Sequence, residues 1–134
     1  MRCLSGPSGN RRLTAEQIAA SPRSTVTIPD HGVSATFEGT ELANVLGDLP
    51  AGEKLRGKAL TKYILVSAAD GYQALFALPE VDRAFTHRKI IVADRRDGKP
   101  LSEKEGPFRV VVEGEKRQAR CVRQVTAIVV GDVR

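Results

Sequence analysis

The chain has 134 residues and a mass of 14.5 kDa, enough for one domain whose core needs no metal or disulfide. No apolar run approaches the roughly 20 residues that span a bilayer, so we expect no membrane span. The formal charge is +5, but aromatic residues make up only 4% of the chain and the basic residues are scattered, which disfavours nucleic acid as a partner. We predict one domain over residues 13–131, preceded by a flexible segment over residues 1–12.

The first part of the chain predicts a helix, a hairpin and a second helix. A capping box that begins at Thr14 predicts a helix that ends before Pro22. β-branched residues over 24–28 predict a strand, and the alternating pattern over 33–38 predicts its antiparallel return. Thr40 is then expected to cap a second helix. The apolar face of that helix would consist of Leu42, Val45, Leu46 and Leu49.

The remaining chain predicts strands joined mostly by tight turns. Residues 50–59 are polar and predict a loop, which leads into a strand over 62–68. Asp70-Gly71 is typical of a type I′ turn and predicts a returning strand over 72–78. Further predictions are a helical turn over 79–85, an Asp-Gly turn at 97–98, and strands over 89–93, 108–112 and 122–130. About seven strands and two or three short helices, without βαβ alternation, predict a β-rich α+β domain with mixed or antiparallel sheets.

Few residues are candidates for chemistry. Nucleotide-binding glycine patterns, nucleophile elbows and zinc-binding spacings are absent from the sequence. Cys3 and Cys121 are far apart in the chain, and a disulfide between them stays an open alternative because sequence separation does not fix spatial distance. Arg120 and Arg123 flank Cys121 and would lower its pKa if they lay close to it. Its position at the start of an apolar strand favours an inert buried thiol instead.

A basic turn near the C-terminus is a candidate anion site. Lys116, Arg117, Arg120 and Arg123 follow the glycine of this turn, Gly114. Such a cluster can hold a phosphate through charge-assisted hydrogen bonds, and arginine can do so with two parallel bonds. The alternative is a charged hairpin that is solvated and binds nothing.

Four stretches of the chain follow the order and spacing of one known family. They are FEGTELANVL (37–46), ILVSAADGYQALFAL (64–78), ADRRDGKPLSEKEGPFRVVVEG (93–114) and ARCVRQVTAIVV (119–130). With the first helix, they resemble the molybdopterin-binding domain of the sulfite-oxidase-like oxidoreductases over about residues 13–130. The resemblance implies the mixed α+β fold of that domain, which agrees with the predicted elements.

The resemblance also implies a cofactor site, but not a complete metal site. It assigns molybdopterin contacts to Arg120, Cys121, Arg123, Tyr72 and Arg109. Family members ligate molybdenum through a cysteine in the loop after the first strand, and the matching residues 28–37 contain none. His31 in that loop does not replace it, because a thiolate is a softer, anionic ligand. Gln124 stands where the family has a tryptophan, and Cys121 where it has a serine.

Two main classes of function therefore stay open, and a basic nucleic-acid binder is a third, weaker alternative. A complete site would be an oxidoreductase centre for oxygen-atom transfer at molybdenum, served by a redox partner protein. Without the metal-ligating cysteine, the alternative is a non-catalytic binding module for an anionic small molecule, a pterin or a partner protein. The resemblance suggests a periplasmic location because family members are often exported, although the first residues lack the apolar stretch of a signal peptide.

Overall fold

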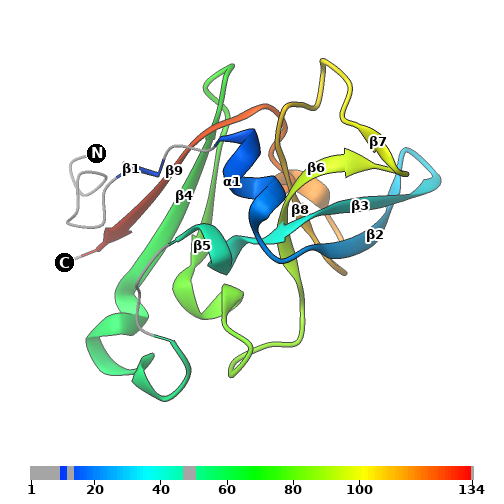
Figure 1. The fold of residues 1–134 in the computed structure, drawn as a ribbon. Coiled ribbons are helices and arrows are strands. Elements are labelled where there is room, and N and C mark those ends of the chain that lie inside the picture. Colours follow the sequence, from blue (N-terminus) through cyan, green and yellow to red (C-terminus); the bar gives the residue numbers. More distant parts are fainter. Residues whose placement is uncertain (1–9, 12–13, 47–50, 134) are drawn as a thin grey trace.

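The computed structural model of the protein describes residues 10–11, 14–46 and 51–133, in which nine strands form two antiparallel sheets (Figure 1). The first sheet contains, in order, β1 (Asn10–Arg11), β9 (Val125–Asp132), β4 (Lys62–Ala68) and β5 (Gln73–Ala77). The second contains β2 (Ser24–Asp30), β3 (Val33–Glu41), β6 (Ile90–Arg96) and β7 (Lys99–Pro100), with β8 (Arg109–Val112) also paired to β6. The predicted β-rich character is therefore confirmed for this part of the chain.

The core lies between the two sheets. Phe76 and Ile64 of the first sheet share one continuous apolar cluster with Phe37 and Ile91 of the second, and all four are fully buried. The first four residues of β6, an uninterrupted apolar run, are buried, and so are the three valines of β8 and its charged first residue, Arg109. The helix α1 (Ala15–Ala20) adds Ile18 to this cluster and contacts β3 and β6.

The predicted first helix and first hairpin are confirmed. Thr14 caps α1, and its side-chain oxygen accepts a hydrogen bond of 3.1 Å from the backbone N–H of Gln17. Strands β2 and β3 pair along the whole of β2 around a two-residue turn, His31-Gly32. Both turn residues have positive φ, which matches the twist of the flanking strands.

The predicted second helix is wrong. Strand β3 continues to Glu41, and only the 3₁₀ turn Leu42–Val45 follows it. Thr40 cannot cap a helix because it pairs with Val92 of β6, so sheet pairing overrides the local preference for a cap. Leu49, the last apolar position of that prediction, lies outside the described residues.

The turn at Asp70-Gly71 joins β4 and β5 as predicted, but it is not a type I′ turn. Of its two residues only Gly71 has a positive φ, whereas type I′ requires both. The N–H of Gly71 donates to Ala68 O at 3.0 Å, and the N–H of Ala68 donates to Tyr72 O at 2.9 Å. The result is a longer hairpin loop in which the left-handed glycine follows the turn.

Short 3₁₀ turns occupy several connections for which the sequence predicts loops or helices. They are Gly52–Lys54, Gly57–Thr61, Leu78–Val81 and Gln118–Arg120. At the N-terminal side, Asn10 and Arg11 pair with β9, while the rest of the predicted flexible segment lies outside the described residues. No helix within the described ranges has the length and apolarity needed to cross a membrane.

Gly39 permits the close approach of β3 to β6. The register of this strand pair shifts between Glu38 and Gly39, which is a β-bulge. A Cβ atom added at Gly39 would lie 1.9 Å from the carbonyl oxygen of Val92 and 2.6 Å from the Cα of Ala93. Both atoms belong to the backbone of a buried strand, so neither can move away without disturbing the packing of that strand.

We expect Gly39→Ala to destabilise the protein by about 3 kcal/mol, because β3 must move away from β6. Gly32→Asn is the control, since Gly32 has open space around it and asparagine tolerates positive φ. Urea unfolding followed by circular dichroism measures both variants. Equal stability of the two variants would contradict the assigned role of Gly39.

Candidate functional site

A cavity of about 310 Å³ opens between three segments of the chain. They are the tip of the β4–β5 hairpin, the β7–β8 loop (residues 101–108) and residues 118–124, which precede β9. The lining residues with polar or charged side chains are Asp70, Tyr72, Lys104, Gln118, Arg123 and Gln124. Cys121 joins Ala68, Ala119 and Val122 in the remainder of the lining.

Gln124 holds the three walls of this cavity together. Its backbone N–H donates to Glu105 O and its side-chain amide donates to Glu103 O, both at 2.8 Å. Its carbonyl accepts a hydrogen bond of 3.0 Å from the N–H of Ala69 in the β4–β5 hairpin. Gln124 has a φ of +51°, which is uncommon for a residue with a side chain and is here maintained by these three bonds.

Tyr72 provides a flat wall at the hairpin tip. Its hydroxyl donates to the carbonyl oxygen of Ala119, which ties the hairpin to the 3₁₀ turn Gln118–Arg120. The side chain is still 48% exposed, so a planar or apolar part of a ligand can pack against the ring.

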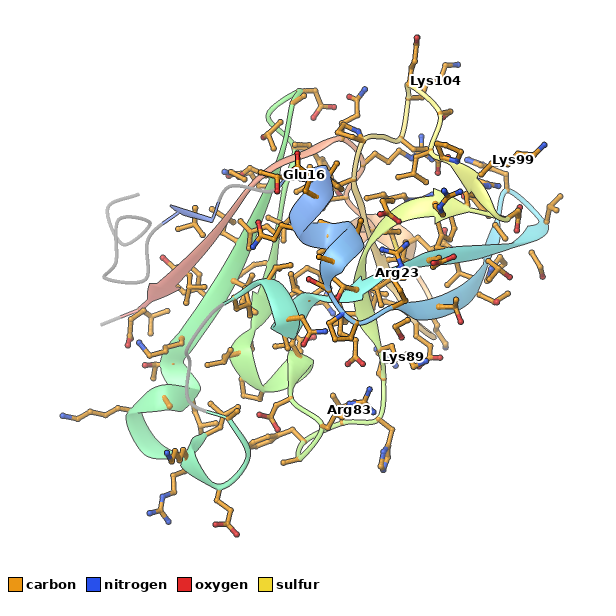
Figure 2. All side chains as sticks on the ribbon, viewed as in Figure 1. Glu16, Arg23, Arg83, Lys89, Lys99 and Lys104 are labelled. Atoms are coloured by element: carbon orange, nitrogen blue, oxygen red, sulfur yellow. The ribbon has the colours of Figure 1, made fainter. Side chains whose placement is uncertain are left out.

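The rim of the cavity is cationic. Arg123 is exposed, and its Nη2 atom lies 3.4 Å from Nε2 of His31. Figure 2 shows Lys104 at the tip of the loop between β7 and β8, with its side chain projecting outward. Asp70 is the one carboxylate in the lining, and one of its oxygens accepts from the backbone N–H of Tyr72. Two cations therefore outnumber one partly engaged carboxylate, which favours an anionic ligand.

Cys121 is a free thiol in a buried position, 6% exposed. Burial raises its pKa, and this outweighs a backbone hydrogen bond at Val112 and the charge of Arg109, which lower it. The raised pKa disfavours the thiolate near pH 7, which makes this thiol a poor nucleophile. This arrangement agrees with the inert alternative from the sequence. Cys3 lies outside the described residues.

Arg120 is engaged in an ion-pair network and does not line the cavity. Its Nη2 atom lies 2.9 Å from Oε1 of Glu80 and also pairs with Glu115, and its Nη1 atom donates to Leu75 O at 3.0 Å. The guanidinium stacks over Phe76, 4.5 Å from the ring centre. Hydrogen bonds to the two carboxylates raise the pKa of Arg120 further, so this cation is already neutralised within the protein.

Arg109 is also absent from the cavity lining and is 2% exposed. Its Nη1 atom lies 2.6 Å from Oε1 of Glu105. Of the five residues that the family resemblance assigned to the cofactor, the structure thus brings Tyr72, Cys121 and Arg123 to one cavity and places Arg120 and Arg109 in ion-pair clusters. Sequence reasoning missed Lys104, Gln118 and Gln124 as lining residues. Only Gln124 carried a signal, its replacement of the family tryptophan.

The lining residues fit an anionic group that carries a planar part, and Cys121 is the one thiol among the described lining residues. Arg123 and Lys104 would hold a phosphate, and the ring of Tyr72 would contact a planar group. Cys121 is buried and its pKa is raised, so a metal would have to displace the proton of a poorly accessible thiol to bind there. Across the described residues no three His, Cys, Asp or Glu side chains gather as a metal site requires.

A scan of known protein families finds no match for this chain, and a search among curated proteins finds none either. A function for the cavity is therefore inferred from the residues that form it.

The Arg120 network predicts a pH effect on stability. Burial raises the pKa of Glu80, but hydrogen bonds from Arg120 and from the Ala77 N–H, together with the charge of Arg120, hold it below its ordinary value of 4.5. The stability from this pair is therefore complete above about pH 4.5 and is lost as the pH falls through the lowered value. We expect Arg120→Met to lose about 1 kcal/mol at pH 7 and to depend less on pH than wild type between about pH 5 and pH 3.

Arg117→Met is the matched control for this experiment, because Arg117 is an exposed arginine of the same basic turn. Denaturant titrations at several pH values give the free energies of unfolding. An Arg120→Met variant with the pH profile of wild type and of the control would show that the ion pairs contribute nothing.

Proposed function

We propose that this protein is a non-catalytic binding module that holds a small anionic ligand in the cavity beside Tyr72 and Arg123. We further propose that its fold is that of the molybdopterin-binding domain of the sulfite-oxidase-like oxidoreductases. A phosphate-bearing pterin would then be one member of the ligand class. The observation that carries the proposal is the meeting of Tyr72, Cys121 and Arg123 at one cavity with a cationic rim.

Arg123 is the cation best placed to bind the anion. In the described part of the chain no carboxylate is ion-paired with Arg123, whereas Arg120 and Arg109 each contact carboxylates. A guanidinium that is not neutralised by the protein can donate two parallel hydrogen bonds to a phosphate or carboxylate. Lys104, on the opposite loop, adds a second positive charge that strengthens attraction without fixing geometry.

The residues in and around the cavity support binding of a ligand rather than catalysis. The thiol of Cys121 is kept neutral by burial, and Asp70 uses one carboxylate oxygen within its own turn. His31, near Arg123, is at an exposed hairpin tip, 81% accessible at its side chain, so it has no desolvated environment in which to act on a substrate. The cavity can thus orient an anion and contact its planar part, which is what a binding module requires.

We expect inorganic phosphate and pyrophosphate to bind at this cavity and Arg123→Met/Lys104→Met to weaken that binding about tenfold or more. The matched control is Lys116→Met/Arg117→Met, which removes the same two charges from exposed positions outside the cavity lining. Isothermal titration at fixed ionic strength gives the dissociation constants. Equal weakening in both double variants would show attraction to net charge alone and would contradict the proposed site.

Molybdenum and pterin analysis separates the module from the oxidoreductase alternative. After expression in a host that makes the cofactor, we expect less than one molybdenum per ten chains, because residues 28–37 contain no cysteine to ligate the metal and the thiol of Cys121 is buried. One metal and one pterin per chain would overturn the non-catalytic proposal and would call for assays of oxygen-atom transfer.

A further inference from the structure

Four charged side chains form a cluster next to the cavity: Asp30, Glu105 and Arg109, which are buried, and Arg96, which is partly exposed. The Nη1 atom of Arg96 lies 2.5 Å from Asp30 and 3.3 Å from Glu105. The Nη1 atom of Arg109 lies 2.6 Å from Glu105 and 3.8 Å from Asp30. Both guanidiniums also lie over the ring of Phe37: that of Arg96 is 5.3 Å and that of Arg109 is 4.9 Å from the ring centre. We call these four residues the charge cluster.

Burial of the charge cluster carries a large desolvation penalty. Asp30, Glu105 and Arg109 are all less than 10% exposed, and Nε of Arg109 is buried without a hydrogen-bond partner. Burial raises the pKa of Asp30, but the hydrogen bond from Arg96 and the charges of both arginines hold it below its usual range, so Asp30 stays ionised. Because apolar residues of similar volume often stabilise such a position better, the charges serve geometry more than stability.

Each carboxylate of the charge cluster belongs to a segment that borders the cavity. Asp30 ends β2 and precedes His31, which contacts Arg123. The carbonyl of the preceding residue, Pro29, accepts a hydrogen bond from the side chain of the cavity residue Gln118.

Glu105 lies in the β7–β8 loop, which itself forms a wall of the cavity. It follows Lys104 in the β7–β8 loop, and its carbonyl accepts the N–H of Gln124. The two arginines contact both Asp30 and Glu105, and so link the β7–β8 loop to the β2–β3 hairpin tip, which contacts the wall formed by residues 118–124.

We propose that the charge cluster positions the walls of the anion-binding cavity, with Arg109 as the central positioning residue acting through Glu105. The cluster sets the β2–β3 hairpin tip, whose His31 contacts Arg123, against the β7–β8 loop, which carries Lys104. This inference rests on the proposed function. It also accounts for the burial of Arg109, which contacts both carboxylates and does not itself reach the cavity.

Amide hydrogen exchange together with phosphate titration tests the proposal. In Arg109→Met and Glu105→Gln we expect protection of the Gln124 N–H to fall about tenfold or more, with the N–H groups of Val66 and Ile128 in the first sheet unchanged. Phosphate affinity should fall at least about fivefold in the same variants. Arg109→Lys keeps the charge and should restore both properties in large part. Arg23→Met, which removes a different ion pair, is the control and should alter neither.

The outcomes separate positioning from general stability and from the proposed function. Equal loss of protection at Gln124, Val66 and Ile128 would mean that the cluster only stabilises the fold, and would overturn the proposal. Unchanged protection and unchanged phosphate affinity in Arg109→Met and Glu105→Gln would overturn it as well. If wild type binds no phosphate, the proposed function fails, and selective loss at Gln124 still supports positioning of the walls. If Arg109→Met does not fold, Glu105→Gln and Arg109→Lys decide in the same way.

Discussion

The close contact between β3 and β6 at Gly39 is the constraint on which the second sheet and the neighbouring cavity depend. The backbone of β6 lies where a side chain of Gly39 would be, so β3 can pair with β2 and β6 at once. Strand β3 carries Phe37, and β6 ends with Arg96, which reaches Asp30 at the end of β2. The bulged pairing of β3 with β6 thus places Arg96 of the charge cluster beside the β2–β3 hairpin.

The attraction of this protein for an anion depends more on where its charges lie in the fold than on its net charge. The chain carries a formal charge of +5, yet the arginines at positions 96, 109 and 120 are each paired with two or more carboxylates. Such pairs lock neighbouring segments together and leave little field for a ligand. Arg123 contacts only a histidine among the interactions described, and it lies on the rim of the cavity. The attraction for an anion therefore resides in one or two side chains.

The cavity combines a firm frame with unreactive chemistry. Gln124 is held in a left-handed conformation by bonds to two segments, and the hydroxyl of Tyr72 joins the hairpin to a third. Burial raises the pKa of the Cys121 thiol, which disfavours the anionic form that nucleophilic catalysis requires. A rigid, cationic and unreactive cavity is suited to holding a ligand, which is the basis of the function we propose.

Local patterns in the sequence determined most of the strands, the first helix and the β-rich class, because alternation and capping act within a few residues. They failed at Thr40, where a neighbouring strand outcompeted the helix cap, and at Asp70, where the loop is longer than its dipeptide indicates. The sequence predicted only part of the candidate site. Resemblance placed Tyr72, Cys121 and Arg123 together, but only the tertiary structure decided that Arg120 and Arg109 are neutralised by carboxylates from distant segments. Whether a cation is free depends on which groups lie within a few ångströms of it, and the order of residues along the chain does not contain that information.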